Sequence, residues 1–370
     1  MRHTTMLSGL LTGLALLGAG PATAQATADA ADETTPTQLV PRYMTLRDEP
    51  ANIDSVAAWH DGHGRHWLLA TAKSTNEVRV YDADNGAPIA SVGRGDGVDL
   101  ARPNGIAVAD DMAFVVERDH ARVSVLALPS LQPIGQFGAD HLVRPYGIWI
   151  GPANADGQRQ VVITDDYINA DDSRPADAAL DHRLQTYRIA RDGDTIAAHW
   201  QHAAGPTRGD GVLRKVESIA GDPAHDRLLV SDEGASQRDI KIFDLAGKFT
   251  GQTIGQGRFQ QDPEGIARVN CGHEAGYWIT TDQGDARNRF YVFDRNDLTY
   301  RGAFESPAVR NTDGIGLTQT AMPHFPDGAL FTVNDDGNVA AFDLGTISRQ
   351  LGPAACRDDA STQAGSQDAA

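Results

Sequence analysis

Cysteine, positive charge and long hydrophobic runs are all scarce in this 370-residue chain. Its 32 Lys and Arg stand against 50 Asp and Glu, which gives a formal net charge of −18. Such a surface repels nucleic acids and anionic membranes, so neither is an expected partner. The two cysteines, Cys271 and Cys356, either pair in an oxidising compartment or remain separate thiols, and the sequence leaves both alternatives open.

The one long hydrophobic run stands at the N-terminus. Arg2 precedes the apolar stretch MLSGLLTGLALLGAG, and the small residues Ala22, Thr23 and Ala24 follow it. This order predicts a secretory signal peptide over residues 1–24, because the run is short and glycine-rich for a membrane span. We therefore expect a periplasmic or secreted protein. Composition also predicts a disordered leader over 25–38 and a flexible tail over 351–370.

Helical periodicity is nearly absent, and a repeated strand pattern takes its place. Each copy has an apolar inner strand with a polar opening, a second run that ends in a charged loop, and a third run such as VRVYD or IKIFD. The openings are separated by 50, 42, 71, 47 and 49 residues and fall at Asp54, Asn104, Tyr146, Glu217, Glu264 and Asp313. This period predicts an all-β fold, a six-bladed β-propeller over residues 39–350.

The ends of the second strands carry further polar residues. They read Lys73, Glu117-Arg118, Asp165-Asp166, Asp232-Glu233, Asp282-Gln283 and Asn334-Asp335-Asp336. In a propeller blade, the start of the first strand and the end of the second lie on one rim, so both sets should meet at one mouth of the channel. Carboxylates packed this closely repel one another unless a hard cation lies among them, and oxygen ligands without His or Cys favour Ca²⁺.

Two of these residues are less common beside a calcium site. Lys73 and Arg118 are cations within the predicted carboxylate group, and such an arrangement suits a site that holds metal and also binds an anion, with phosphate as the natural candidate. Each taken alone could equally be an exposed loop charge. The glutamates Glu217 and Glu264 lie inside apolar strands, where an unpaired acid is costly unless it binds something.

At this point the residues resemble the β-propeller phytases, calcium-dependent enzymes that remove phosphate from myo-inositol hexakisphosphate. The clearest match is NTDGIGLTQTAMPHFPDGALFTVNDDGN, residues 311–338. The runs VESIAGDPAHDRLLVSDE (216–233), DPEGIA (262–267) and DSVAAW (54–59) are also similar to family segments. The resemblance covers most of the chain and is strongest from Val216 to Asn338.

The resemblance implies a secreted phosphomonoesterase of the 3-phytase type, a monomer that uses several Ca²⁺ ions and takes a small phosphorylated substrate as its calcium complex. It implies metal ligation by Asp54, Tyr146, Glu217, Glu233, Asp262, Glu264, Asp313, Asn334 and Asp335. It implies substrate contacts from Lys73, Arg118 and Tyr146, and catalytic roles for Lys73, Arg118, Glu217 and Glu264. The family's lysine in the third blade is replaced by Asp165-Asp166-Tyr167, and Arg208, Arg214 and Lys215 are the candidates to substitute for it.

Two alternatives remain on the sequence. Six-bladed lactonases hold one calcium in the channel, and PNGIAVADD resembles that broader group. A secreted propeller could also present a binding surface with calcium in a purely structural role, since a fold does not determine a function. The number of acids and the adjacent cations favour phosphate chemistry over both.

Overall fold

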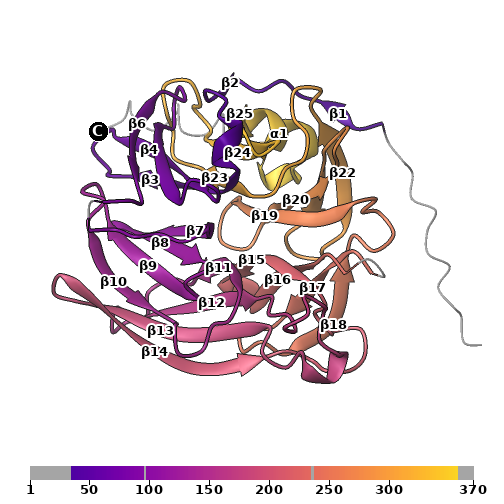
Figure 1. Ribbon diagram of the computed structural model, residues 1–370. Helices are drawn as coiled ribbons and strands as arrows, with labels where there is room; N and C mark the ends of the chain where they lie inside the picture. The colour runs from indigo at the N-terminus through magenta and orange to yellow at the C-terminus, as the bar shows by residue number, and fades with distance from the viewer. Residues whose placement is uncertain (1–34, 96, 235–236, 357–370) are drawn as a thin grey trace, which may run out of the picture. The chain divides into compact units, whose positions relative to one another are not determined.

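The computed structural model describes residues 35–356, apart from residues 96 and 235–236. Six small antiparallel sheets are arranged around a ring, which confirms the predicted six-bladed β-propeller (Figure 1). The predicted signal peptide, most of the predicted leader and the tail from residue 357 lie outside the described residues. Within the described ranges, no helix has the length and apolar character needed to cross a membrane.

Each blade contributes four strands that run in sequence order from the channel outward, except in blade 6. Blades 1 to 3 are β3 (Ile53–His60), β4 (His66–Ala72), β5 (Glu77–Asp82) and β6 (Pro88–Val92); β7 (Pro103–Ala109), β8 (Met112–Glu117), β9 (Arg122–Ala127) and β10 (Pro133–Phe137); β11 (Pro145–Ile150), β12 (Arg159–Asp165), β13 (Leu184–Asp192) and β14 (Thr195–Ala204). Blades 4 to 6 are β15 (Val216–Asp222), β16 (Arg227–Asp232), β17 (Asp239–Phe243) and β18 (Phe249–Ile254); β19 (Asp262–Asn270), β20 (Gly276–Gln283), β21 (Arg289–Asp294) and β22 (Tyr300–Glu305); β23 (Ile315–Thr318), β24 (Ala329–Asn334) and β25 (Asn338–Asp343).

The chain ends close the ring. The short strand β2 (Tyr43–Met44) pairs with β25 as the outer strand of blade 6, and β1 (Thr37–Gln38) lies parallel to β22 at the edge of blade 5. After blade 6 come α1 (Leu344–Leu351) and a 3-10 turn at Ala354–Cys356, where Cys356 forms a disulfide with Cys271. The boundaries expected at residues 38 and 351 therefore fall inside the folded unit, because the pairing of β1 with β22 and the disulfide of Cys356 hold these segments.

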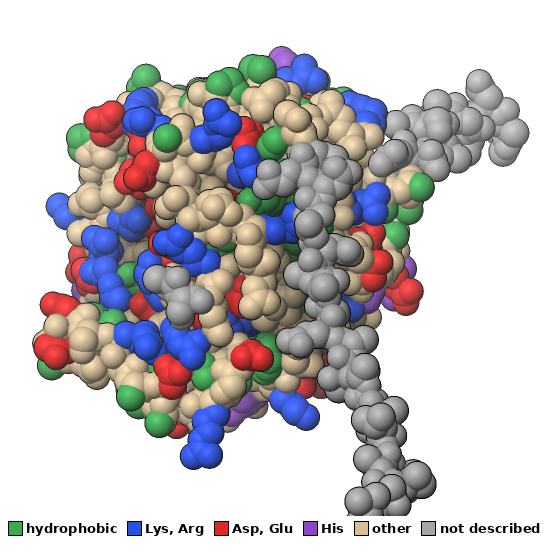
Figure 2. All heavy atoms as spheres, turned by 90° about the vertical axis from the view of Figure 1, so that its right-hand side faces the viewer, with side chains coloured by type: hydrophobic (Ala, Val, Ile, Leu, Met, Phe, Trp, Pro, Cys, Tyr) green, Lys and Arg blue, Asp and Glu red, His purple; other side chains and the backbone are tan. Residues whose placement is uncertain are grey.

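The core lies between neighbouring blades rather than within one. Six clusters of buried hydrophobic side chains are present among the described residues, one at each interface between adjacent blades. Second strands are buried on both faces, as in β8, where all six residues are buried, and their β-branched and aromatic residues suit that position. On the surface, basic and acidic side chains are interleaved on the face shown in Figure 2.

The inner strands of blades 1 to 5 are irregular at one shared place. In blade 1, for example, the antiparallel register shifts between Ile53 and Val56, so Asp54 lies in a bulge at the start of β3. Corresponding shifts occur at the starts of β7, β11, β15 and β19. Bulges re-aim side chains. In these five blades the bulge directs the polar opening residue at the channel.

The inner ring is held by contacts to the backbone carbonyls of the opening residues. Thr71 and Thr164 donate hydroxyl hydrogen bonds of 2.6 Å to the carbonyls of Asn104 and Glu217 in the next blade. The glycine that follows an opening residue lies against the backbone carbonyl of the opening residue in the next blade. A Cβ atom added at Gly147 would lie 2.2 Å from the Glu217 carbonyl oxygen. Glycine is therefore required here by the close approach of two strands.

Substitution of Gly147 by Ala tests this packing. We expect a loss of about 1–3 kcal/mol in the free energy of unfolding, since the added methyl group must displace the neighbouring backbone. Denaturant unfolding would measure it, with Gly135→Ala as control, because a Cβ there meets Ile196 at an ordinary 3.4 Å. Equal effects of the two substitutions would contradict the account of the inner ring.

Candidate metal and anion site

One opening residue from every blade lines a single narrow cavity at the channel mouth. Gly or Ser follows the opening residue in all six blades, and in five of them this residue lines the cavity as well. The six opening residues are Asp54, Asn104, Tyr146, Glu217, Glu264 and Asp313. Successive opening residues are 42 to 71 positions apart in the chain, and the fold brings them together at one cavity.

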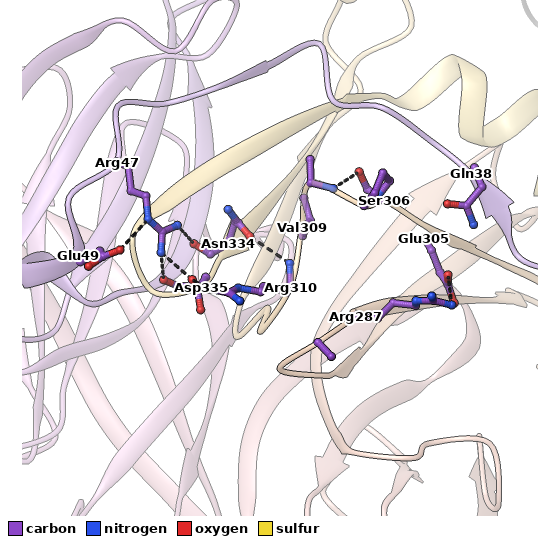
Figure 3. A pocket seen from close by; sticks show the side chains of 13 residues that line it. Gln38, Arg47, Glu49, Arg287, Glu305, Ser306, Val309, Arg310, Asn334 and Asp335 are labelled. Atoms are coloured by element: carbon purple, nitrogen blue, oxygen red, sulfur yellow. Dashed lines mark hydrogen bonds and ion pairs between the residues drawn. The ribbon is translucent and has the colours of Figure 1, made fainter.

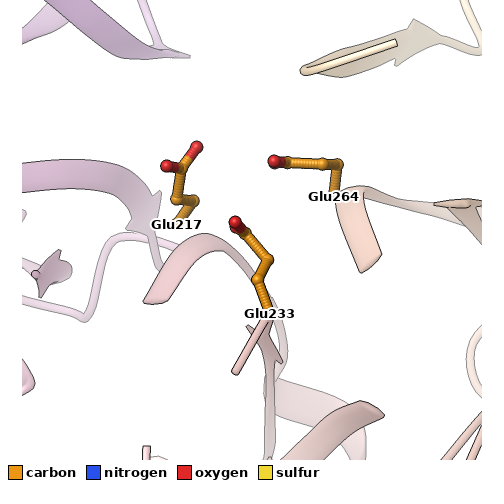
Figure 4. Close-up of side chains that lie close together, drawn as sticks. All are labelled: Glu217, Glu233 and Glu264. Atoms are coloured by element: carbon orange, nitrogen blue, oxygen red, sulfur yellow. The ribbon is translucent and has the colours of Figure 1, made fainter. Parts of the chain in front are cut away.

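Three glutamates form the acidic centre of this cavity. Glu217 opens β15, Glu264 lies in β19, and Glu233 follows β16. One carboxylate oxygen from each lies within 4.8 Å of the other two, and the three side chains point toward a common space (Figure 4). Glu233 and Glu264 are buried, whereas Glu217 keeps some exposed surface because the cavity reaches it.

Lys73 joins the first and last blades at the same cavity. Its Nζ lies 2.6 Å from Asp54 Oδ1 and 3.2 Å from Asp313 Oδ2. The side-chain amide of Gln283 donates a hydrogen bond to the other oxygen of Asp313. Burial opposes the charge on Lys73, but Asp54 and Asp313 outweigh it and raise the lysine pKa, so the ammonium form is retained.

A second lysine, Lys215, lies on the other side of the acidic centre. It forms an ion pair with Glu233, and its Nζ lies 3.8 Å from Asp262. From the sequence, Lys215 is one of three candidates to replace the phosphate-binding lysine of the third blade. It is not singled out there, because it precedes an inner strand instead of following a second strand. Of the other two, Arg214 pairs with Asp177 and Gln237.

The lysines do not neutralise the acids. Five carboxylates (Asp54, Glu217, Glu233, Glu264 and Asp313) face two ammonium groups, which leaves a formal charge of −3 (five minus two). Burial, and then the charge of Glu233, raises the pKa of Glu217 and Glu264 well above the ordinary value. Burial also raises the pKa of Glu233, to about 8. Without a bound cation, the fold keeps these carboxylates close together although their negative charges repel one another.

The residues present fit a calcium ion. Glu233 Oε1 and Asn104 Oδ1 are buried acceptors without a hydrogen-bond partner among the described residues. Buried acceptors are normally satisfied, so both oxygens are free to ligate a cation. All donors at the cavity are oxygen atoms, which Ca²⁺ prefers, and no His or Cys lines it.

Three more predicted residues lie at the edge of this centre. Tyr146 is buried in the cavity wall, and the Arg118 guanidinium interacts with its hydroxyl group while Nε donates a hydrogen bond to Asp119. Asp262 is more exposed and lies 3.4 Å from Arg238. Arg118 is thus oriented by the site, though it lies outside the group of carboxylates.

The structure does not place Asn334 and Asp335 at the acidic centre. Asn334 Oδ1 accepts the backbone N–H of Arg310, and its amide donates to Asn338. Asp335 Oδ2 lies 2.6 Å from both Arg47 and Arg310, in a separate pocket (Figure 3). The left-handed backbone at Asp335 and Asp336 belongs to the tight turn at this strand end. Asp336 is not among the predicted ligands. Its negative charge contributes to the raised pKa of Asp313, for which burial is the main cause.

The other acids at the ends of the second strands are structural. Asp232 accepts the backbone N–H groups of Arg214 and Lys215, which lead into the inner strand of the same blade. Glu117, Asp165 and Asp282 hold the corresponding segments of their own blades. The carboxylate group is therefore smaller than the sequence predicts, because Glu117, Asp165, Asp232 and Asp282 accept backbone N–H groups. Glu233, one residue past Asp232, joins the acidic centre instead.

Comparison with known proteins supports the fold and leaves the family open. No family model matches the chain, and no curated protein matches its sequence. Regucalcin from Agrobacterium tumefaciens, described as a calcium-binding protein, is similar in structure, with a TM-score of 0.52 and 13% identity over 84% of this chain and 95% of that chain. Hydrazine synthase from Kuenenia stuttgartiensis has a TM-score of 0.45 and 14% identity over 78% of this chain and 75% of that chain. At 13% identity the likeness to regucalcin shows a shared propeller fold and nothing of the chemistry.

The raised pKa values predict how stability depends on pH when divalent cations are removed. The folded chelated protein binds protons more tightly than the unfolded chain, so its free energy of unfolding should fall as the pH rises from about 4.3, the ordinary value, to about 8, the value for Glu233. Both lysines titrate above this window. Calcium should reverse the trend by replacing the protons, and denaturant unfolding would measure both.

Glu217→Gln provides the comparison for this titration. It removes one of the strained carboxylates, so the chelated variant should lose less stability across the same window. A wild-type stability that rises with pH in chelator, or an unchanged slope in the variant, would contradict the electrostatic account.

Proposed function

We propose that the protein is a calcium-dependent phosphomonoesterase that acts on a small molecule carrying several phosphates, of the inositol hexakisphosphate type. The observation that carries the proposal is the placement of Lys73 and Lys215 on opposite sides of an under-neutralised carboxylate centre. A site for calcium alone gains nothing from two ammonium groups. A site for calcium and a phosphate gains donors for the anion.

The chain's own cations would bind and orient the phosphate. Lys73 and Lys215 can turn toward phosphate oxygens while they keep one carboxylate contact each, and Arg118 extends the same row of donors past Tyr146. The carboxylate contacts hold these groups beside the cavity before substrate binds. Charge that develops on the phosphate oxygens in the transition state would therefore meet fixed donors.

Calcium would be held by Glu217, Glu233 and Glu264, with Asp313 and Asn104 beside them. When bound, it supplies positive charge to the phosphate and lowers the pKa of a coordinated water. No protein nucleophile is then required. Glu217 and Glu264 border the same space, and their carboxylates would accept the proton of the attacking water.

The remaining parts of the proposal concern cellular context. We propose that the protein acts as a secreted or periplasmic monomer and takes its substrate as a calcium complex. The disulfide between Cys271 and Cys356 supports an oxidising compartment. The net charge of −18 disfavours the free anion and favours one already paired with calcium.

Phosphate release from inositol hexakisphosphate tests the proposal. We expect release in calcium and its loss in excess chelator. Glu217→Gln and Lys73→Met should each lower kcat by about 100-fold or more, the usual effect of removing one electrostatic contact to the transition state. Lys248→Met and Glu274→Gln alter exposed charges outside the site and should leave the rate unchanged.

Other outcomes separate the alternatives. Full activity in chelator would contradict the metal dependence. Hydrolysis of lactones without phosphate release would favour the lactonase-type reaction, and a folded, calcium-binding protein inactive on both substrates would favour a binding propeller. Thermal melts of each variant would show whether a lost rate reflects lost folding.

A further inference from the structure

A group of histidines lies at the far end of blade 1, away from the carboxylate centre. His60 ends β3 and His66 begins β4, and the hairpin between them carries His63. Asp54, at the site, stands at the other end of the same strand, so the six-residue step along β3 places the histidines about 20 Å away. No role in the proposed hydrolysis involves them.

His60 and His66 are direct partners across the two antiparallel strands. Their rings meet edge to face, with centroids 4.8 Å apart, and the two Nδ1 atoms are 2.6 Å apart. Two imidazole lone pairs that face each other repel, so one proton lies between these nitrogens in an N–H···N hydrogen bond. A metal ion would replace this proton after the two rings move apart, because Zn–N bonds of about 2.0–2.1 Å need a wider separation of the nitrogens. The pair thus presents two convergent nitrogen donors at one point of the surface.

Thr318, in blade 6, orients the His60 ring through its other nitrogen, Nε2. Its Oγ1 lies 2.6 Å from His60 Nε2 and also accepts the backbone N–H of Thr320. A hydroxyl that already accepts one hydrogen bond in this way can accept a second from Nε2–H. That tautomer leaves the lone pair of Nδ1 directed at His66, which is how a hydrogen bond at one ring nitrogen prepares the other for a metal.

We propose that His60 and His66 bind one divalent transition-metal ion through their Nδ1 atoms. Imidazole nitrogen suits Zn²⁺, Co²⁺, Ni²⁺ and Cu²⁺, whereas the all-oxygen centre suits calcium, so the two sites differ in the metals they select. Water completes the coordination, and His63 is a further donor on the same hairpin, which turns at Gly62 and Gly64.

The site also lies where the ring closes. His60 belongs to blade 1 and Thr318 to blade 6, so an ion at this point reinforces the contact between the first and last blades. A ligand that binds the folded state and not the unfolded chain raises the stability of the fold. The metal should therefore raise the melting temperature.

Titration of the whole protein with Co²⁺ and Zn²⁺ tests this proposal, in excess calcium to occupy the carboxylate centre and at neutral pH, where imidazole is largely unprotonated. We expect a visible Co²⁺ absorption band that saturates at one ion per chain and disappears as Zn²⁺ replaces Co²⁺. His60→Gln and His66→Gln should remove the band. Thr318→Val keeps the side-chain shape and should weaken Zn²⁺ binding about 10- to 100-fold, the usual effect of losing the partner that orients a ligand.

Matched variants decide the outcome. His273→Gln changes an exposed histidine on another hairpin, and Glu217→Gln changes the carboxylate centre; both should bind Co²⁺ as the wild type does. Unchanged binding in the His60 and His66 variants, or binding lost in Glu217→Gln, would overturn the proposal. If those histidine variants fail to fold, normal Zn²⁺ affinity in Thr318→Val would overturn it as well.

Discussion

The close contact between each bulged inner strand and the backbone of its neighbour is the constraint on which the site depends. Gly105 and Gly147 lie against the carbonyls of Tyr146 and Glu217, and Gly314 donates a backbone hydrogen bond to Asp54. These contacts set the width of the channel mouth. A side chain in place of the glycines would push the blades apart and separate the residues that line the cavity.

A narrow mouth has an electrostatic consequence. Residues from six blades are brought so close together that Glu217, Glu233 and Glu264 share one space, and burial removes the water that would screen them. Lys73 and Lys215 compensate for part of this charge. The negative charge that remains attracts a divalent cation. The packing that closes the ring therefore also favours metal binding.

The repeat predicts much of this arrangement. Six strand openings at a regular period are sufficient to place Asp54 beside Asp313, although 259 residues separate them in the chain (313 minus 54). The period also predicts which second-strand ends lie on that rim. The backbone positions that all blades share can therefore be predicted from one sequence.

The rest depends on local detail that the period does not carry. Asp232 and Glu233 are adjacent acids, yet the first caps the backbone of its own blade and the second reaches the channel. Asp335 is drawn away by Arg47, which comes from the distant N-terminal segment. β1, just before that segment, lies at the end of the predicted leader over 25–38, whose polar composition predicts disorder instead. Long-range pairing of this kind leaves no local pattern in the sequence.

The most direct test of the central claim is a crystal structure of the protein with calcium and phosphate. The account predicts calcium within about 2.3–2.6 Å of oxygens of Glu217, Glu233 and Glu264, with phosphate between the ion and Lys73 or Lys215. Calcium bound only at the Asp335 turn, or a carboxylate centre that stays free of calcium at saturating concentration, would contradict it.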